Sequence, residues 1–138
     1  MTRKSQVSTE YLIVIGFVTF LIVSTLAIGF FYIGQINDKI KINQLQNFAN
    51  KITSSAESVF YAGEPSKVRI STYLPGGVES IEIDENEDVI RFTIATSSGT
   101  NTISFSSNVP ISGTISKNEG VKVIIIEAQS NQVFISQE

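Results

Sequence analysis

An uninterrupted apolar segment near the N-terminus constrains this chain more than any other feature. No charged residue occurs between Glu10 and Asp38, and residues 11–33 read YLIVIGFVTFLIVSTLAIGFFYI. About 20 apolar residues are enough for a helix to cross the core of a bilayer. Because the segment is apolar around its whole circumference, it does not fit a helix on the surface of a soluble domain. It predicts a helix that needs lipid or other apolar helices around it.

The flanks of this segment predict its orientation and its fate. Arg3 and Lys4 precede it, and the positive-inside rule then places the N-terminus in the cytoplasm and the residues after 37 outside. A secretory signal peptide would have a shorter apolar region followed by a small-residue cleavage site. This segment is longer and ends in Phe30, Phe31 and Tyr32. A lasting membrane anchor therefore fits better than a conventional signal peptide.

The residues just before the apolar segment resemble a processing motif. Residues 3–11 read RKSQVSTEY and resemble the class III signal peptide of archaeal type IV pilin precursors. In that family a short basic leader ends in a small residue, cleavage follows before a Gln, and a Glu stands four residues after that Gln. Ser5 matches the small residue, Gln6 the new N-terminus, Ser8 the small hydroxyl position, and Glu10 with Tyr11 the Glu–aromatic pair. Beyond residue 34 the resemblance is only architectural.

The resemblance implies a structural subunit of an extracellular filament that serves in adhesion, and not an enzyme. A prepilin peptidase would cut between Ser5 and Gln6 and remove the leader, residues 1–5, with Arg3 and Lys4. The mature chain would then leave the membrane lipid and polymerise with other copies, served by a pilus assembly ATPase and a membrane platform protein. The residues expected to pack the filament are Gln6, Glu10, Tyr11, Phe17, Phe20, Phe30 and Phe31.

Glu10 has two interpretations. It could lie at the headgroup level and complement the helix N-terminus. Alternatively, it could pair with the α-amine that cleavage frees on Gln6, whose ordinary pKa is about 8. Among packed apolar helices a lone carboxylate is heavily penalised, and breaking a buried ion pair costs about 3–5 kcal/mol. The pair would then fix the axial register of neighbouring helices, unless Gln6 cyclises to a neutral lactam.

The helix is expected to continue beyond the apolar segment, over residues 6–62 of the mature chain. After Gly34 the pattern becomes amphipathic, and Gly63 with Pro65 gives a stop signal. A helix from about Ser8 to Ala62 would span roughly 80 Å. A coiled-coil stalk is the alternative, although the stripe is short and irregular for a heptad seam. The apolar stripe of the second half, residues 36–62, consists of Ile36, Ile40, Leu45, Phe48, Ile52, Ala56 and Val59.

From Lys67 onward the period drops to two, which predicts a β-rich head, residues 67–138. The expected strands are residues 68–74, 78–83, 89–96, 102–106, 111–116, 121–128 and 132–136. They predict an α+β fold, a long helix followed by an antiparallel, Ig-like β-sandwich. Residues 121–128 are almost continuously apolar and suit a central strand buried on both faces. Because so few residues bury little surface, the amphipathic half of the helix should complete the core.

Composition excludes several functions. The chain has no Cys and no His, which removes disulfides, thiolate chemistry and the usual zinc ligands. A net charge of −3 argues against a nucleic-acid surface. No nucleophile stands beside a plausible base, and no cofactor is expected. Residues 84–88, DENED, fit a hairpin turn better than a Ca²⁺ loop. The Ser- and Thr-rich surface suits an exposed coat or O-linked sugar, and no N-glycosylation sequon occurs.

Two other classes of protein share most of these features. One is a minor pilin-like subunit that primes or tips a filament. The other is a bitopic membrane protein whose outer domain binds a partner outside the cell. Archaellins have a similar architecture, but their mature start usually lacks the Gln-x-Ser-x-Glu-Tyr pattern found at residues 6–11.

Overall fold

The fold begins with one unbroken helix. The computed structural model describes the backbone of residues 3–138 and the side chains from Ser8 onward. Helix α1 (Arg3–Ala62) contains no proline that would interrupt it. It ends at Gly63, which has a φ of 73° and donates its N–H to the carbonyl oxygens of Val59 and Phe60, at 3.2 Å and 3.1 Å. Glycine adopts this left-handed cap without a Cβ clash, so the predicted stop signal is confirmed.

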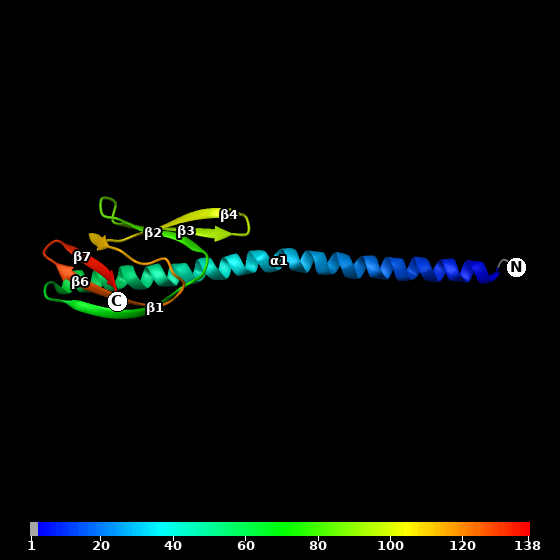
Figure 1. The fold of residues 1–138 in the computed structure, drawn as a ribbon, viewed down its shortest axis with the longest axis horizontal. Helices are drawn as coiled ribbons and strands as arrows, with labels where there is room; N and C mark the ends of the chain where they lie inside the picture. Colours follow the sequence, from blue (N-terminus) through cyan, green and yellow to red (C-terminus); the bar gives the residue numbers. More distant parts are fainter. Residues whose placement is uncertain (1–2) are drawn as a thin grey trace. The chain divides into compact units, whose positions relative to one another are not determined.

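The chain divides into two units, Met1–Asn37 and Asp38–Glu138, and α1 contributes to both. The second unit carries all the strands of the described chain (Figure 1). The bounds of the strands are β1 (Lys67–Leu74), β2 (Val78–Asp84), β3 (Val89–Thr96), β4 (Gly99–Ser106), β5 (Ile111–Gly113), β6 (Gly120–Gln129) and β7 (Gln132–Gln137). They form a four-stranded sheet, β1-β6-β7-β5, and a three-stranded sheet, β2-β3-β4. The fold is therefore α+β, as predicted.

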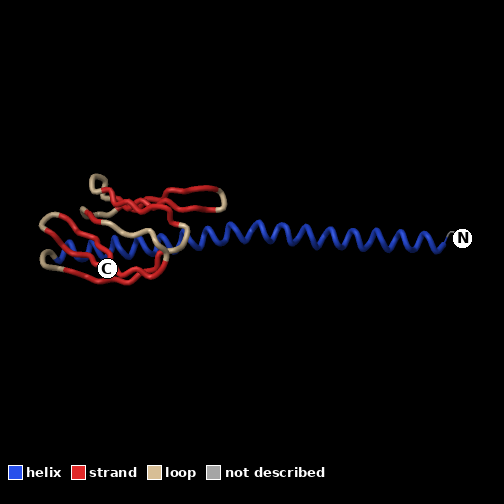
Figure 2. The backbone as a smooth tube through the Cα atoms, viewed as in Figure 1, coloured by secondary structure: helices blue, strands red, loops and turns tan. Residues whose placement is uncertain are grey.

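Two strand pairings join strands that are not consecutive in the sequence. Figure 2 shows the strands and the loops that connect them. β1 pairs with β6 and not with β2, because the chain crosses to the other sheet at residues 75–77. There the carbonyl of Gly77 accepts a 2.8 Å hydrogen bond from the N–H of Ala95 in β3. The sheets are rich in antiparallel pairs, as expected, with one exception: β5 pairs with β7 in parallel. β5 also ends at Gly113, earlier than the expected residue 116. β6 lies between β1 and β7, as predicted for a central strand, but Val121 is 71% exposed, so the expected burial of β6 on both faces is wrong.

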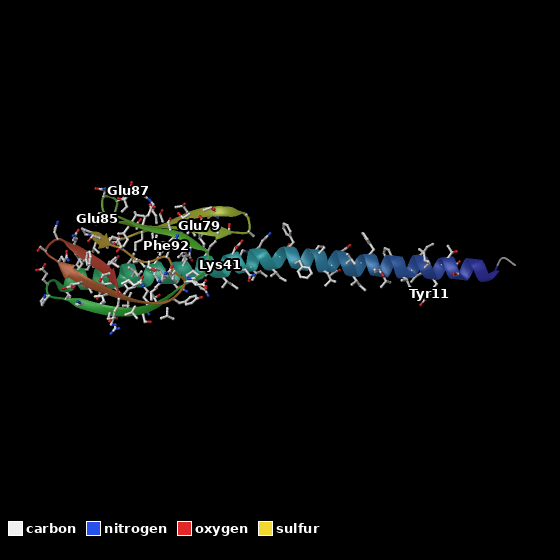
Figure 3. All side chains as sticks on the ribbon, viewed as in Figure 1. Tyr11, Lys41, Glu79, Glu85, Glu87 and Phe92 are labelled. Carbon is white, nitrogen blue, oxygen red and sulfur yellow. The ribbon has the colours of Figure 1, made fainter. Side chains whose placement is uncertain are left out.

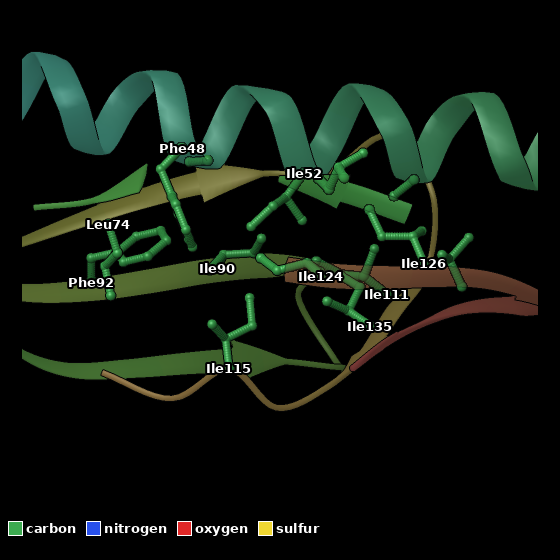
Figure 4. Packing of buried hydrophobic residues seen from close by; sticks show 14 of the residues in the cluster. Phe48, Ile52, Leu74, Ile90, Phe92, Ile111, Ile115, Ile124, Ile126 and Ile135 are labelled. Atoms are coloured by element: carbon green, nitrogen blue, oxygen red, sulfur yellow. The ribbon is translucent and has the colours of Figure 1, made fainter. Parts of the chain in front are cut away.

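One hydrophobic cluster joins the helix to both sheets (Figure 4). The helix contributes Leu45, Phe48, Ala49, Ile52, Ala56 and Val59, which recur every three or four residues and so share one face. The strands contribute Ile70, Leu74, Val78, Ile90, Phe92, Ile94, Ile111, Ile124, Ile126, Ala128, Val133 and Ile135. The amphipathic half of α1 therefore completes the core. The stripe is buried only from Leu45, since Ile36 and Ile40 are 53% and 48% exposed.

Polar contacts accompany this packing along α1. The ammonium group of Lys51 donates to the carbonyl of Ser71 in β1 at 2.8 Å. The side-chain amide of Asn108 donates to the carboxylate of Glu57 at 2.7 Å. Each bond joins the helix to a segment at least 20 residues away in the sequence. They orient the helix on the strands, in addition to the non-directional apolar contacts.

Candidate functional site

The apolar part of α1 is the most prominent surface of the first unit. Every large apolar side chain between Tyr11 and Ile33 is between 47% and 74% exposed. By length and composition this helix could cross a membrane, a test that a signal sequence near an N-terminus also passes. So large an apolar surface is unfavourable in water. The segment therefore requires an apolar environment or apolar partners.

The aromatic residues expected to pack a filament are distributed around this helix. Phe17, Phe20, Phe30 and Phe31 are 61% to 74% exposed, and Tyr11, labelled in Figure 3, is 68% exposed. At about 100° of rotation per residue, they point in several directions and do not gather on one face. The arrangement suits a helix surrounded by neighbours on all sides.

Two polar side chains inside the apolar segment, Ser24 and Thr25, are satisfied within the helix. The hydroxyl of Ser24 donates to the carbonyl of Phe20 at 2.7 Å, and that of Thr25 donates to Leu21 at 2.8 Å. Such bonds to the preceding turn are the usual way to hide a hydroxyl in an apolar helix. Neither hydroxyl therefore needs a polar partner outside the chain.

The expected processing site lies at the start of α1. Glu10 is exposed and immediately precedes the apolar segment. The backbone of residues 3–7 is helical, whereas Met1, Thr2 and the side chains of Arg3, Lys4, Ser5 and Gln6 lie outside the described part of the structure. The pairing of Glu10 with a freed amine on Gln6 therefore remains a prediction from the sequence.

The acidic segment of residues 84–88 forms the turn between β2 and β3, where Figure 3 shows Glu85 and Glu87. Asp84 organises this turn, because one carboxylate oxygen accepts the N–H groups of Asn86 and Glu87 at 3.0 Å and 3.4 Å. The other oxygen accepts a bond from Arg91 at 2.8 Å. The N–H of Asn86 is the main cause that lowers the pKa of Asp84 below 3.8. These contacts fit a hairpin turn.

Across residues 3–138, no group of three or more acidic side chains is placed to hold a metal ion. Comparison of the chain with models of known protein families, with curated proteins and with solved structures found no match. The described residues make an apolar helical surface that suits association, followed along the chain by a β-rich unit with its own core.

The sequence did not reveal one polar contact of the second unit. Asp38, the first charged residue after the apolar segment, accepts hydrogen bonds from the N–H of Ser97 at 2.9 Å and from its hydroxyl. Ser97 lies in the turn between β3 and β4, 59 residues further on. The hydroxyl is the main cause that lowers the pKa of Asp38 below 3.8. Because the two residues are so far apart in the sequence, no local sequence pattern predicts this contact.

Proposed function

We propose that this chain is the precursor of a structural filament subunit similar to archaeal type IV pilins. The observation that carries the proposal is the exposed apolar surface of residues 11–33. Glu10 stands directly before this surface, and the basic residues Arg3 and Lys4 lie further upstream. A lipid bilayer satisfies this surface before assembly. Other copies of the same helix satisfy it in a filament.

In this proposal the chain enters the membrane with its N-terminus in the cytoplasm. A prepilin peptidase cuts between Ser5 and Gln6, which removes the basic leader and retains the apolar helix. An assembly ATPase and a membrane platform protein then extract the mature chain. The head, residues 67–138, lies on the outside of a cell-surface filament that adheres to surfaces.

Glu10 fixes the axial register of the helices in this proposal. Its carboxylate pairs with the α-amine of Gln6 in the same or a neighbouring subunit. A helix in a wrong axial position would leave both charges unpaired among apolar side chains, at a cost of several kcal/mol. The ion pair therefore favours the correct axial register of neighbouring helices, even where the shape of the apolar surface alone would not determine it.

The head is proposed to be an Ig-like sandwich closed by α1. Its division into four and three strands supports this, as does the single cluster that both sheets share. The buried helix residues, such as Phe48 and Ile52, lie in that cluster. The helix would thus supply apolar volume that seven short strands do not provide.

Two measurements test the function. Mass spectrometry of the chain expressed with a prepilin peptidase should give a mature N-terminus at Gln6, with or without loss of ammonia. A bulky Ser5→Trp variant should block cleavage, and Ser5→Ala should not. Electron microscopy should then show thin filaments that contain the mature chain. A chain that keeps residues 1–5 beside an active peptidase would instead support a bitopic membrane protein.

Antibody labelling of filaments distinguishes a major subunit from a minor pilin-like subunit. An antibody against the head should decorate a filament along its whole length if the chain forms the bulk of it. Labelling only at one end would assign the chain to a tip or priming role.

A further inference from the structure

The turn between β3 and β4 is held against the start of the second unit. Ser97 in this turn donates its N–H, at 2.9 Å, and its hydroxyl to the carboxylate of Asp38. The hydroxyl of Thr96 donates to the carbonyl of Gly99 at 2.6 Å and closes the turn. Asp38 is the first charged residue after the apolar segment and the first residue of the second unit. The turn of residues 96–99 therefore lies beside the point at which this unit begins.

Only a short length of helix separates Asp38 from the apolar segment. α1 is continuous through residues 33–38, so Asp38 lies about 8 Å beyond Ile33 along the helix. The headgroup layer on each side of a bilayer is roughly 5–8 Å thick, which is half the difference between the full thickness and the core. A tilted helix rises less, and its side chains point back toward its N-terminus. When residues 11–33 occupy the bilayer core, the carboxylate of Asp38 and the turn bonded to it therefore lie at the level of the headgroups.

The two ends of β3 differ in charge. The turn before β3, residues 84–88, carries four carboxylates, whereas residues 92–116, which include the turn after β3, carry no charged side chain. Ser97, Ser98 and Thr100 are exposed at this second turn and bear hydroxyl groups. Anionic lipid phosphates repel carboxylates, whereas a hydroxyl can donate a hydrogen bond to a phosphate oxygen. The end of β3 beside Asp38 is therefore the end that suits an anionic layer.

Two lysines close to Asp38 lie on opposite sides of α1. Lys39 and Lys41 are two positions apart, which is about 200° around the helix. The ammonium group of Lys41 and the carboxylate of Glu119 both lie close to residues 76–77, so these two charges offset each other. Lys39 is exposed on the other side of the helix, and no ion pair among the described side chains includes it. Lys39 is therefore a cation that can bind phosphate at the same level as the turn.

We propose that Lys39 and the turn of residues 96–99 bind the phosphate-bearing headgroups of the membrane that holds α1. The ammonium group of Lys39 and the hydroxyls of the turn donate to phosphate oxygens. The bond between Asp38 and Ser97 keeps the turn at that level. This inference rests on the first step of the proposed function, anchoring of the precursor in a membrane. It requires neither leader cleavage nor filament assembly.

Fluorescence quenching of the full-length chain in proteoliposomes tests the contact. The chain has no Cys, so a fluorophore on one introduced thiol reports one position. In vesicles of phosphatidylcholine and phosphatidylglycerol with nitroxide-labelled headgroups, a label on Thr100→Cys should lose most of its fluorescence.

Ser130→Cys is the matched control, because Ser130 is also an exposed hydroxyl residue at a hairpin turn. It lies beyond the far end of α1, since Ala128 donates its N–H to the carbonyl of Ser66 at 2.9 Å. α1 rises about 36 Å from Asp38 to Ala62, so the label on Ser130→Cys should lose little fluorescence. Leu21→Cys, quenched by a nitroxide in the acyl chains, reports whether α1 is anchored.

Two further variants test the residues that hold the turn at the headgroups. Asp38→Ala, placed in the Thr100→Cys chain, should reduce the quenching while near-UV circular dichroism stays unchanged. Lys39→Glu in the same chain should reduce it more in vesicles that contain phosphatidylglycerol than in phosphatidylcholine alone, because the reversed charge is repelled by the anionic lipid.

The outcomes separate this contact from membrane anchoring. The inference is overturned if Thr100→Cys and Ser130→Cys are quenched equally, or if both Asp38→Ala and Lys39→Glu leave the quenching unaltered. Quenching of Leu21→Cys without quenching of Thr100→Cys would overturn the headgroup contact and leave the anchor intact. Absence of quenching at Leu21→Cys would overturn the anchor and this inference together.

Discussion

The rings of Phe48 and Phe92 meet edge to face, with centroids 6.0 Å apart and an interplanar angle of 86°. Phe48 lies on α1, Phe92 lies on β3, and both are fully buried. Phe105 of β4 continues the contact, with its centroid 5.7 Å from that of Phe92. The helix is therefore a structural layer of the core and not a stalk joined to it.

The first prediction concerns the smallest part of the chain that folds. A fragment of residues 38–138 should fold cooperatively, because it retains every buried residue that α1 contributes. A fragment of residues 63–138 should remain unfolded, since about seventy residues of sheet bury too little apolar surface alone. Near-UV circular dichroism and urea unfolding distinguish the two. Cooperative unfolding of the shorter fragment would show that the helix is dispensable to the core.

The second prediction is that Phe48→Ala destabilises the 38–138 fragment strongly. Truncation of a buried Phe removes apolar contacts and leaves a cavity, which typically costs about 3–5 kcal/mol. Tyr61→Ala is the control, because Tyr61 is an aromatic residue on the same helix that is 76% exposed. Urea unfolding should place the control within about 0.5 kcal/mol of the parent. Equal losses from both variants would contradict the burial pattern.

The third prediction compares two glycines with nearly the same φ. Gly113 and Gly99 have φ values of 124° and 122°, where an added Cβ is strained. A Cβ on Gly113 would lie 1.9 Å from the carbonyl oxygen of Ile135, whereas one on Gly99 would meet nothing within 4 Å. Gly99→Ala should therefore cost about 1–3 kcal/mol, and Gly113→Ala clearly more, because β5 must separate from β7. Equal midpoints in urea would disprove the close approach.

The fourth prediction follows from the lowered pKa of Asp38. A depressed pKa stabilises the fold above the ordinary value of 3.8, and this contribution is lost as the pH falls through the lower value in the folded chain. Asp38→Asn should therefore be less stable than the parent at neutral pH, and the difference should shrink below about pH 4. Ser97→Ala removes the hydroxyl donor and should raise the pKa of Asp38 in a carboxyl NMR titration of the full-length chain. An unchanged titration in Ser97→Ala would refute the contact.

The fifth prediction concerns assembly. Glu10→Ala should allow leader cleavage but prevent filament formation, because the α-amine of Gln6 would lose its partner at a cost of about 3–5 kcal/mol. Glu64→Ala removes an equivalent charge from an exposed position outside α1 and should assemble normally. Immunoblots follow cleavage, and electron microscopy follows assembly. Normal filaments from Glu10→Ala would remove Glu10 from the assembly mechanism.

Local features of the sequence predicted most elements of the fold. The end of α1 could be predicted because Gly63 has a specific conformational role. All seven strands of the described chain begin and end within three residues of their expected bounds. The partners of β1 and β5 could not be predicted from the sequence. Alternation tells which face of a strand is apolar, but it does not tell which strand lies beside it. The pairing of β1 with β6 and the parallel pairing of β5 with β7 depend on contacts distant in the sequence.

Some features of the candidate site could likewise be predicted from the sequence, and others could not. The apolar surface of residues 11–33 follows directly from composition, and the helical bonds of Ser24 and Thr25 follow from their position. The bond between Asp38 and Ser97 and the exposure of Val121 on β6 could be found only once the strands were placed. Both depend on which segment lies opposite which, and a one-dimensional pattern does not carry that information.

The helix residues inside the core have a mechanical consequence. Leu45, Phe48, Ile52, Ala56 and Val59 belong to the same continuous helix that contains residues 11–33, with no linker between them. Tension applied along α1 therefore reaches the strands through the packed side chains of this row. The force acts parallel to the helix–sheet contacts, so all of them resist it together. Such a joint yields only when several contacts slip at once, whereas a flexible tether would first extend before it transmitted the tension.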